Sequence, residues 1–254
     1  MAEYETIRRA GAGVRSSTID VGLRAHMNKV YGLMSVAMLI TGVLAYVVGT
    51  DYALAVAGQE TRFIPFGLLK TMFTSPVKYI IMFAPLIVVF GFSAGLNRMS
   101  ENAARGVFFL FSALMGLSIA SIFVVYTGLS IANTFFVTAI AFAGLSLWGY
   151  TTKKDISGWG SFLIMGVIGL FVAMLVNIWL QSPAIQFAVS GIGVLIFAGL
   201  TAYDTQKIKT TYIQMAHAGQ SEWLGKAAIM GALSLYLDFL NMFMFLLQFM
   251  GNRN

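Results

Sequence analysis

Seven continuous apolar runs, each about 20 residues long, constrain the fold of this chain more than any other feature. The runs occupy residues 30–48, 77–96, 106–126, 131–150, 159–180, 185–203 and 227–250. A helix needs about 20 apolar residues to span the hydrocarbon core of a bilayer. Strands of a membrane barrel are about half as long and alternate in polarity. The runs therefore predict an all-α membrane protein, a bundle of seven transmembrane helices.

The composition agrees with this class of protein. Hydrophobic residues make up 58% of the chain and charged residues only 10%, whereas a soluble domain of this length keeps more charge for its surface. The chain has no cysteine, which excludes disulfides, thiol catalysis and thiolate metal sites. Its two histidines, His26 and His217, fall outside the predicted spans, and neither is expected to bind a metal. We expect no resident cofactor and no resident metal.

The predicted organisation is one membrane domain with short polar ends. Residues 1–29 form a polar N-terminal segment, residues 30–250 the seven-helix domain and residues 251–254 a tail. Two connections between spans are long, residues 49–76 and 204–226. All other connections are short.

The two long connections differ in kind. Residues 49–76 are expected to form an ordinary loop, although the 63–69 stretch is apolar enough to lie on the membrane surface. In the second connection, apolar residues recur at i, i+4 and i+7: Ile208, Tyr212 and Met215. This spacing predicts that the sixth helix continues past the membrane as an amphipathic extension, which Gly219 ends.

Lys and Arg are distributed unequally about the predicted membrane. One side holds Arg8, Arg9, Arg15, Arg24, Lys29, Arg98, Arg105, Lys153, Lys154, Lys207, Lys209 and Lys226, and the other holds Arg62, Lys70, Lys78 and Arg253. Because cytoplasmic loops carry the excess of basic residues, the N-terminus is predicted to be cytoplasmic. This bias also explains the net charge of +6, so no binding to nucleic acid is expected.

Two carboxylates lie in or against the apolar runs, Asp204 at the end of the sixth and Asp238 within the seventh. An ionisable group at membrane depth is costly unless it faces water or a partner, and it marks a functional site. Asp238 lies 11 residues past Ala227, roughly 16 Å along the helix and near mid-membrane. Asp204 lies at the cytoplasmic mouth, where it is either part of this site or an ordinary carboxylate at a helix end.

Asp238 belongs to a polar stripe. Ser234, Asp238, Asn241 and Gln248 are spaced at i, i+4, i+7 and i+14, which places them on one face of a helix. Such a stripe turns away from lipid, so the seventh helix is expected at the centre of the bundle. Thr201, three residues before Asp204, is expected beside the same path.

Arg98 ends the second predicted span on the cytoplasmic side. As a single residue it is explained by the positive-inside bias. With two carboxylates at the same mouth, we expect it to pair with Asp204 and to act as a charge latch. Neighbouring carboxylates do not both ionise easily, so protonation of the pair is expected to decide whether the mouth is shut.

The residues around the two aspartates resemble the signature of the Bax inhibitor-1 family, the transmembrane Bax inhibitor motif proteins, and the bacterial branch in particular. The matching segments are LTAYDTQKI at 200–208 and ALSLYLDFLN at 232–241, supported by Asn97, Arg98 and Met99 and by Gly116, Leu117 and Ser118. The seven-span pattern extends the resemblance over the whole chain. One departure is the stretch between Asp204 and Asp238, which is longer here than in the best-understood bacterial relatives.

The resemblance implies a seven-helix bundle with the last helix central and an aspartate pair, Asp204 and Asp238, that senses pH. It also implies that the pair gates a Ca²⁺ leak and that Arg98 latches it. Ser234, Asn241, Gln248 and Thr201 are then expected to line the path, with Ca²⁺ passing transiently because a leak requires weak binding. The bacterial inner membrane is the expected location.

Two alternatives stay open. Other bacterial relatives are linked to restraint of a membrane-bound ATP-dependent protease, so the chain is either a channel or a non-transporting modulator of such a protease. An intramembrane aspartyl protease is a more remote alternative, because Tyr203 and Asp204 resemble half of its motif. The other half requires Gly-x-Gly-Asp, which Asp238 lacks. We therefore expect a protein that is not an enzyme.

Overall fold

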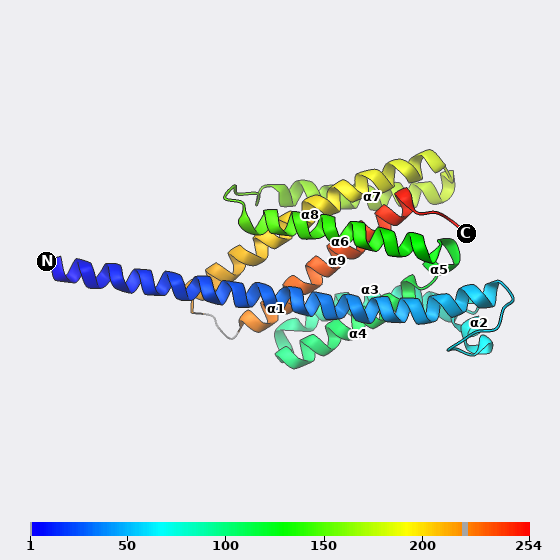
Figure 1. Ribbon diagram of the computed structural model, residues 1–254, viewed down its shortest axis with the longest axis horizontal. Coiled ribbons are helices and arrows are strands. Elements are labelled where there is room, and N and C mark those ends of the chain that lie inside the picture. Colours follow the sequence, from blue (N-terminus) through cyan, green and yellow to red (C-terminus); the bar gives the residue numbers. More distant parts are fainter. Residues whose placement is uncertain (1, 220–222) are drawn as a thin grey trace.

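The computed structural model describes residues 2–219 and 223–254, and their side chains from residue 19 onward. The long helices are α1 (Ala2–Val56), α3 (Val77–Gly95), α4 (Glu101–Ile119), α6 (Gly128–Thr151), α7 (Trp159–Leu180), α8 (Pro183–His217) and α9 (Leu224–Met250) (Figure 1). The short elements between them are α2 (Phe66–Thr74), the 3-10 turn η1 (Leu96–Arg98) and α5 (Ile122–Val125).

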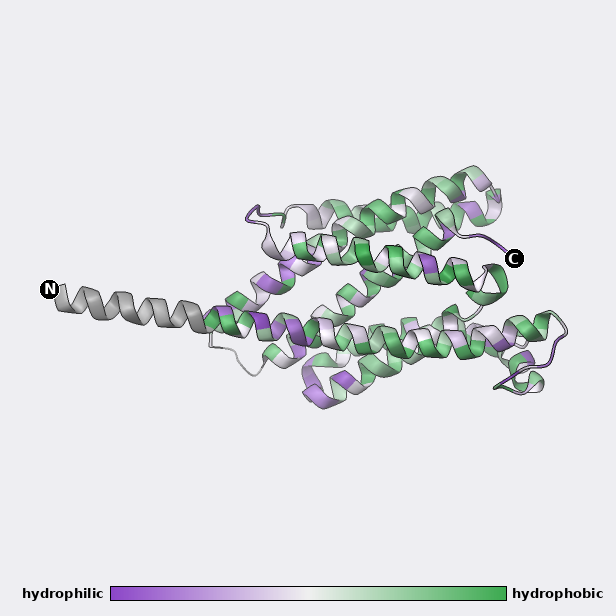
Figure 2. Ribbon diagram, in the orientation of Figure 1, coloured by the Kyte–Doolittle hydropathy of each residue, from purple (hydrophilic) through white to green (hydrophobic). Residues whose placement is uncertain are grey.

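The described helices include seven that are long and apolar enough to cross a membrane. Hydrophobic residues fill the middle of the bundle and hydrophilic residues gather toward its ends (Figure 2). Large apolar side chains point outward, among them Ile140, Phe162 and Leu195, each more than 70% exposed. This exposure is expected where lipid is the solvent. The prediction of an all-α, seven-span membrane protein is confirmed.

Two helices extend well beyond the predicted apolar runs. Helix α1 runs from Ala2 to Val56, and α8 continues to His217. Ile208 and Tyr212 are buried on this continuation of α8, and Gly219 follows it with a φ of 71°. The predicted amphipathic extension is therefore confirmed. The part of the long connection at 220–222, and the side chains of Arg8, Arg9 and Arg15, lie outside the described residues.

Helix α9 lies at the centre of the bundle. Two thirds (67%) of its apolar span is buried, against 11% for α3 and for α7. It packs against α8, α1, α6 and α4. Small residues such as Ala228, Gly231 and Ala232 are buried on it and let neighbouring backbones come close. The predicted central position of the last helix is confirmed.

A hydrogen-bond chain ties α9 to two other helices. The Thr41 hydroxyl lies 2.8 Å from the Ser112 carbonyl, 3.0 Å from the Ala37 carbonyl and 2.8 Å from the Tyr236 hydroxyl. Because Thr41 has one hydroxyl hydrogen and carbonyls only accept, Tyr236 must donate to Thr41. This chain fixes α1, α4 and α9 together, with the Tyr236 ring edge-on against Phe108 and Phe111.

We expect Gly116→Ala to lower the stability of the bundle by about 1–3 kcal/mol. A Cβ at position 116 would lie 2.7 Å from the Thr41 carbonyl oxygen, so α1 and α4 would have to separate. Gly106→Ala on the same helix is the matched control, since no heavy atom lies within 4 Å of a Cβ there. Thermal unfolding followed by circular dichroism in detergent would separate the two. Equal melting temperatures for both variants would contradict the close contact.

The two ends of the bundle differ in charge. The first part of α1, the α3–α4 connection with the start of α4, the α6–α7 connection, the end of α8 and the start of α9 lie at one end of the bundle, which we call the basic end (Figure 1). These segments contain Arg24, Lys29, Arg98, Arg105, Lys153, Lys154, Lys207, Lys209 and Lys226. The opposite end holds α2, the start of α8 and the C-terminus (Figure 1). There Leu69 of α2 is fully buried with Val48 and Ala120, so segment 49–76 is more ordered than the ordinary loop expected.

Candidate functional site: a buried aspartate below a polar mouth

A cavity of about 310 Å³ opens at the basic end between α1, η1, α8 and α9. We call it the mouth cavity. Its polar lining comprises His26, Asp204, Lys207, Thr211, Lys226 and Ser234. Asp204 and Ser234 were both predicted from the sequence as site residues, and the structure brings them to the same cavity. Asp204 is half-buried here, with Lys207 as the nearest basic residue on its own helix.

Asp238 lies one helical turn deeper than Ser234 along α9. Its side chain is 4% exposed, and its Oδ2 atom has no hydrogen-bond partner among the described residues. Asp204 lies on α8, the helix that packs most extensively against α9. A buried carboxylate oxygen without a partner is costly, so it requires an explanation beyond packing.

Arg98 does not reach the aspartates in this arrangement. It ends η1 with an exposed side chain, and no ion pair within 4 Å joins it to Asp204 or Asp238 in the described part of the chain. Leu96, two residues earlier, lines the mouth cavity instead. The latch role of Arg98 therefore stays a prediction.

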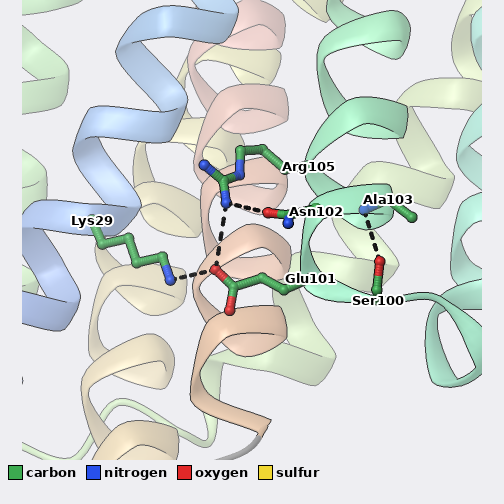
Figure 3. Close-up of polar contacts among 6 residues, drawn as sticks. All are labelled: Lys29, Ser100, Glu101, Asn102, Ala103 and Arg105. Carbon is green, nitrogen blue, oxygen red and sulfur yellow. Dashed lines mark hydrogen bonds and ion pairs between the residues drawn. The ribbon is translucent and has the colours of Figure 1, made fainter.

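The nearby acid that does bind basic residues is Glu101, at the start of α4. Its Oε1 atom accepts a 2.7 Å hydrogen bond from Lys29 of α1 and lies 3.9 Å from Arg105 (Figure 3). All three side chains are partly exposed, so the interaction contributes less than about 1 kcal/mol. The interaction of Glu101 with Lys29 joins α1 to α4 near the mouth cavity, but neither residue lines that cavity.

His26 and Lys226 line the mouth cavity although the sequence did not single them out for it. His26, which precedes the first predicted span, is 7% exposed, and its ring lies 4.9 Å from that of Tyr212. A signal existed, because His26 precedes the buried residues Val30, Met34, Ala37 and Thr41 at helical spacing. Lys226 donates to the Asn97 carbonyl at 3.4 Å, a contact between distant segments that no local pattern predicts.

The other predicted path residues are spread along the bundle. Thr201 is fully buried and its hydroxyl donates to the Phe197 carbonyl at 2.8 Å. Asn241 donates to the Leu237 carbonyl at 2.8 Å, so its amide nitrogen is satisfied within α9. Gln248 lies 3.3 Å from the Ser190 hydroxyl near the opposite end. Neither Thr201 nor Asn241 lines the mouth cavity.

Gln248 belongs to a second polar space. This cavity of about 390 Å³, which we call the amide cavity, lies between α7, α8 and α9 at the opposite end. Its polar lining is made of amide side chains: Asn177, Gln181, Gln186 and Gln248. The polar stripe of α9 thus has one cavity beside Ser234 and another beside Gln248.

A pair of stacked rings interrupts the stripe between the two cavities. Phe245 follows Asp238 by seven residues, so it lies on the same face of α9. Its ring stacks on Phe197 of α8 at 5.8 Å, and both side chains are buried. A Cβ at Gly193 would lie 2.6 Å from the Phe245 ring, so glycine is needed there to seat it. The stacked rings of Phe245 and Phe197 therefore interrupt the polar stripe of α9 between the two cavities.

The fold and these cavities define an integral, multi-pass membrane protein with a buried acid below a polar mouth. A family model described as "Inhibitor of apoptosis-promoting Bax1" matches residues 23–254. The chain therefore belongs to the Bax inhibitor-1 family, as the resemblance of residues 200–208 and 232–241 predicted.

Similar proteins match along nearly their whole length. The inner membrane protein YbhL of Escherichia coli is 44% identical over 233 residues, which cover 91% of this chain and 93% of that protein. A protein of Caulobacter vibrioides is 43% identical over 234 residues, covering 92% and 91%. One of Rickettsia prowazekii is 42% identical over 239 residues, covering 94% of each chain.

Proposed function

We propose that this protein is a pH-gated leak pathway for Ca²⁺ in the bacterial inner membrane, with its basic end in the cytoplasm. The observation that carries the proposal is Asp238, a buried carboxylate with an unpartnered oxygen one turn below the polar mouth cavity. Membrane acids of this kind mark ion or proton paths. The basic end supports a cytoplasmic N-terminus through the positive-inside bias.

The aspartate pair supplies the charge and the pH response. When both are ionised, Asp204 and Asp238 attract a divalent cation into the path between mid-membrane and the mouth cavity. When the pair holds a proton, the attraction falls, so influx decreases as pH decreases. Ca²⁺ prefers six to eight oxygen ligands. In the described residues, His, Asp and Glu side chains form no cluster of three or more. A leak requires weak, transient binding of the ion.

Closure has two proposed elements. Phe245 and Phe197 separate Asp238 from the amide cavity, and an apolar constriction of this kind stops ions by excluding water. Arg98 is the proposed latch, and this role requires the three-residue turn η1 to rotate so that the guanidinium faces Asp204. In this proposal the aromatic pair closes the path by itself when Arg98 is exposed on η1, as it is in this arrangement.

The test uses purified protein in liposomes that enclose a Ca²⁺-sensitive dye. Influx is followed from pH 6 to pH 8 against empty liposomes. We expect influx that rises with pH. If influx stays at the level of empty liposomes throughout, the leak is excluded, and the modulator of an ATP-dependent membrane protease becomes the function to examine by co-purification.

We expect Phe245→Ala to raise Ca²⁺ influx at pH 8 by about tenfold or more, because removing the ring connects the polar stripe to the amide cavity. The same liposome assay measures it. Phe187→Ala is a matched control, since Phe187 stacks on Phe249 farther along the same helix pair and is exposed. Equal influx in Phe245→Ala and the unsubstituted protein would show that the path does not follow this face of α9.

A further inference from the structure

A long lateral groove runs along the membrane face between α1 and α6. It consists of two adjoining cavities of about 630 and 650 Å³, both lined by Tyr31 and Phe142. The first lies toward the basic end and the second toward the middle of the membrane. We call the two together the lateral groove. It is separate from the mouth cavity, with which it shares no lining residue.

The groove exists because α1 and α6 both pack on α9 and, in the described residues, are not packed closely on each other. Helix α9 is visible between them in Figure 1, and its Phe239 side chain forms part of the floor. The two walls are joined where the cavities meet: the Tyr31 hydroxyl lies 2.6 Å from that of Ser146, which lies 2.9 Å from that of Thr205.

The two halves of the groove have different chemistry. Beyond Tyr31 the lining is mostly apolar and includes Met34, Met38, Val43 and Phe135. From Tyr31 to Tyr46, 15 residues of α1 span roughly 22 Å. One leaflet of the hydrocarbon core is about 15 Å thick. The apolar half is therefore long enough for one acyl chain of the adjacent leaflet.

The half toward the basic end adds polar and positively charged side chains to an apolar lining. Arg24 and Asn28 line it and are exposed, and Arg24 forms no ion pair with any described residue. Lys209 lies at its edge, where the ammonium donates to the Tyr150 carbonyl at 2.7 Å. Among the side chains that the structure describes, no acidic one lines either cavity. The charge is complementary to an anionic group at the height of lipid headgroups.

We propose that the lateral groove binds one anionic phospholipid of the surrounding bilayer. Its phosphate lies at Arg24 and Asn28, and one acyl chain lies in the apolar half against Phe239. The lipid then fills the space that α1 and α6 leave open and bridges both helices to α9. This proposal does not depend on Ca²⁺ passage.

The experiment places the protein in nanodiscs with equal amounts of phosphatidylglycerol and phosphatidylcholine of identical acyl chains. Native mass spectrometry then counts the lipids that stay bound on release. We expect retention of phosphatidylglycerol over phosphatidylcholine by about fivefold, the ratio that one basic residue near a lipid surface provides. Arg24→Gln should bring this ratio close to one.

Filling the apolar half gives a second, independent measurement. Gly42 lines it, and no heavy atom lies within 4 Å of a Cβ there, so the side chain of Gly42→Phe starts into the open space of the groove. We expect it to reduce retention of both lipids. Gly32→Phe is the matched control, because position 32 on α1 is equally open and lies outside the groove.

Circular dichroism and gel filtration confirm that each variant is folded. If Gly42→Phe and Gly32→Phe retain the same lipid, or if Arg24→Gln keeps the full preference for phosphatidylglycerol, the site is excluded. A loss of Ca²⁺ influx in the liposome assay would leave these lipid ratios unchanged, so the two proposals fail separately.

Discussion

Replacing Asp238 with asparagine is expected to remove the pH dependence of Ca²⁺ influx and to lower influx at pH 8 by at least about tenfold. Asparagine keeps the size of the side chain but carries no charge at any pH. A cation near a carboxylate gains on the order of 4 kcal/mol at 4 Å in a medium of effective dielectric constant about 20, and tenfold in rate corresponds to about 1.4 kcal/mol. The liposome assay from pH 6 to pH 8 measures both effects.

Asp155→Asn is the matched control for this variant. Asp155 is an exposed carboxylate in the connection between α6 and α7, at the basic end. The Ser157 backbone N–H lowers the pKa of Asp155 below its ordinary value, so it stays ionised from pH 6 to pH 8 and cannot produce a response there. We expect its influx to match that of the unsubstituted protein. A normal pH profile in Asp238→Asn would refute the assignment of the sensor.

Asp204→Asn distinguishes a pair from a single sensor. Asp204 lines the mouth cavity beside α9, and in the proposed pair its charge acts on Asp238. Its removal should therefore shift the pH at which influx changes while leaving some response. An unchanged profile in Asp204→Asn together with an altered one in Asp238→Asn would assign the response to Asp238 alone, and Asp204 would be an ordinary helix-end carboxylate.

The sequence predicts what depends on local periodicity. Continuous apolar runs specify the seven spans, and the spacing of Ser234, Asp238, Asn241 and Gln248 specifies a polar face that has to avoid lipid. The central position of α9 follows from that face. The extension of α8 through Ile208 and Tyr212 follows from spacing in the same way, because each of these features arises within one helix.

The features that the sequence did not reveal depend on which helices meet. In the sequence Phe245 is one more apolar residue of α9. Its interruption of the polar stripe becomes apparent only from its contacts with Phe197 and Gly193 of α8. The lateral groove is likewise a consequence of how far apart α1 and α6 lie on α9. Arg98 shows the converse: its position in the sequence suggested an ion pair, but the side chain is exposed on η1 in this arrangement.

We expect Asp51→Ala to give the largest loss of order at the opposite end of the bundle. Asp51 is fully buried near the end of α1, and its carboxylate accepts backbone hydrogen bonds from Arg62 at 3.1 Å, Phe63 at 2.6 Å and Ile64 at 2.7 Å. Alanine leaves these three N–H groups without their acceptor. The expected cost is on the order of 5 kcal/mol or more, because three hydrogen bonds are lost and each hydrogen bond to a charged group contributes roughly 1.5–3 kcal/mol.

The loss of order should appear first in the connection between α1 and α2, which Asp51 holds, and only then in the membrane spans. Hydrogen exchange measured by mass spectrometry on peptides covering residues 57–66 should become at least about 100-fold faster, while peptides from α9 keep their protection. Asp51→Asn retains one acceptor oxygen, so its exchange rate in residues 57–66 should lie between those of the unsubstituted protein and Asp51→Ala. Glu60→Gln, in the same connection and exposed, should leave exchange unchanged. The acceptor lies on α1, and all three donors are backbone groups 11 to 13 residues later. Unchanged exchange in Asp51→Ala would therefore contradict the prediction. It would mean that the packing of Leu69 against Val48 and Ala120 orders this connection without the carboxylate.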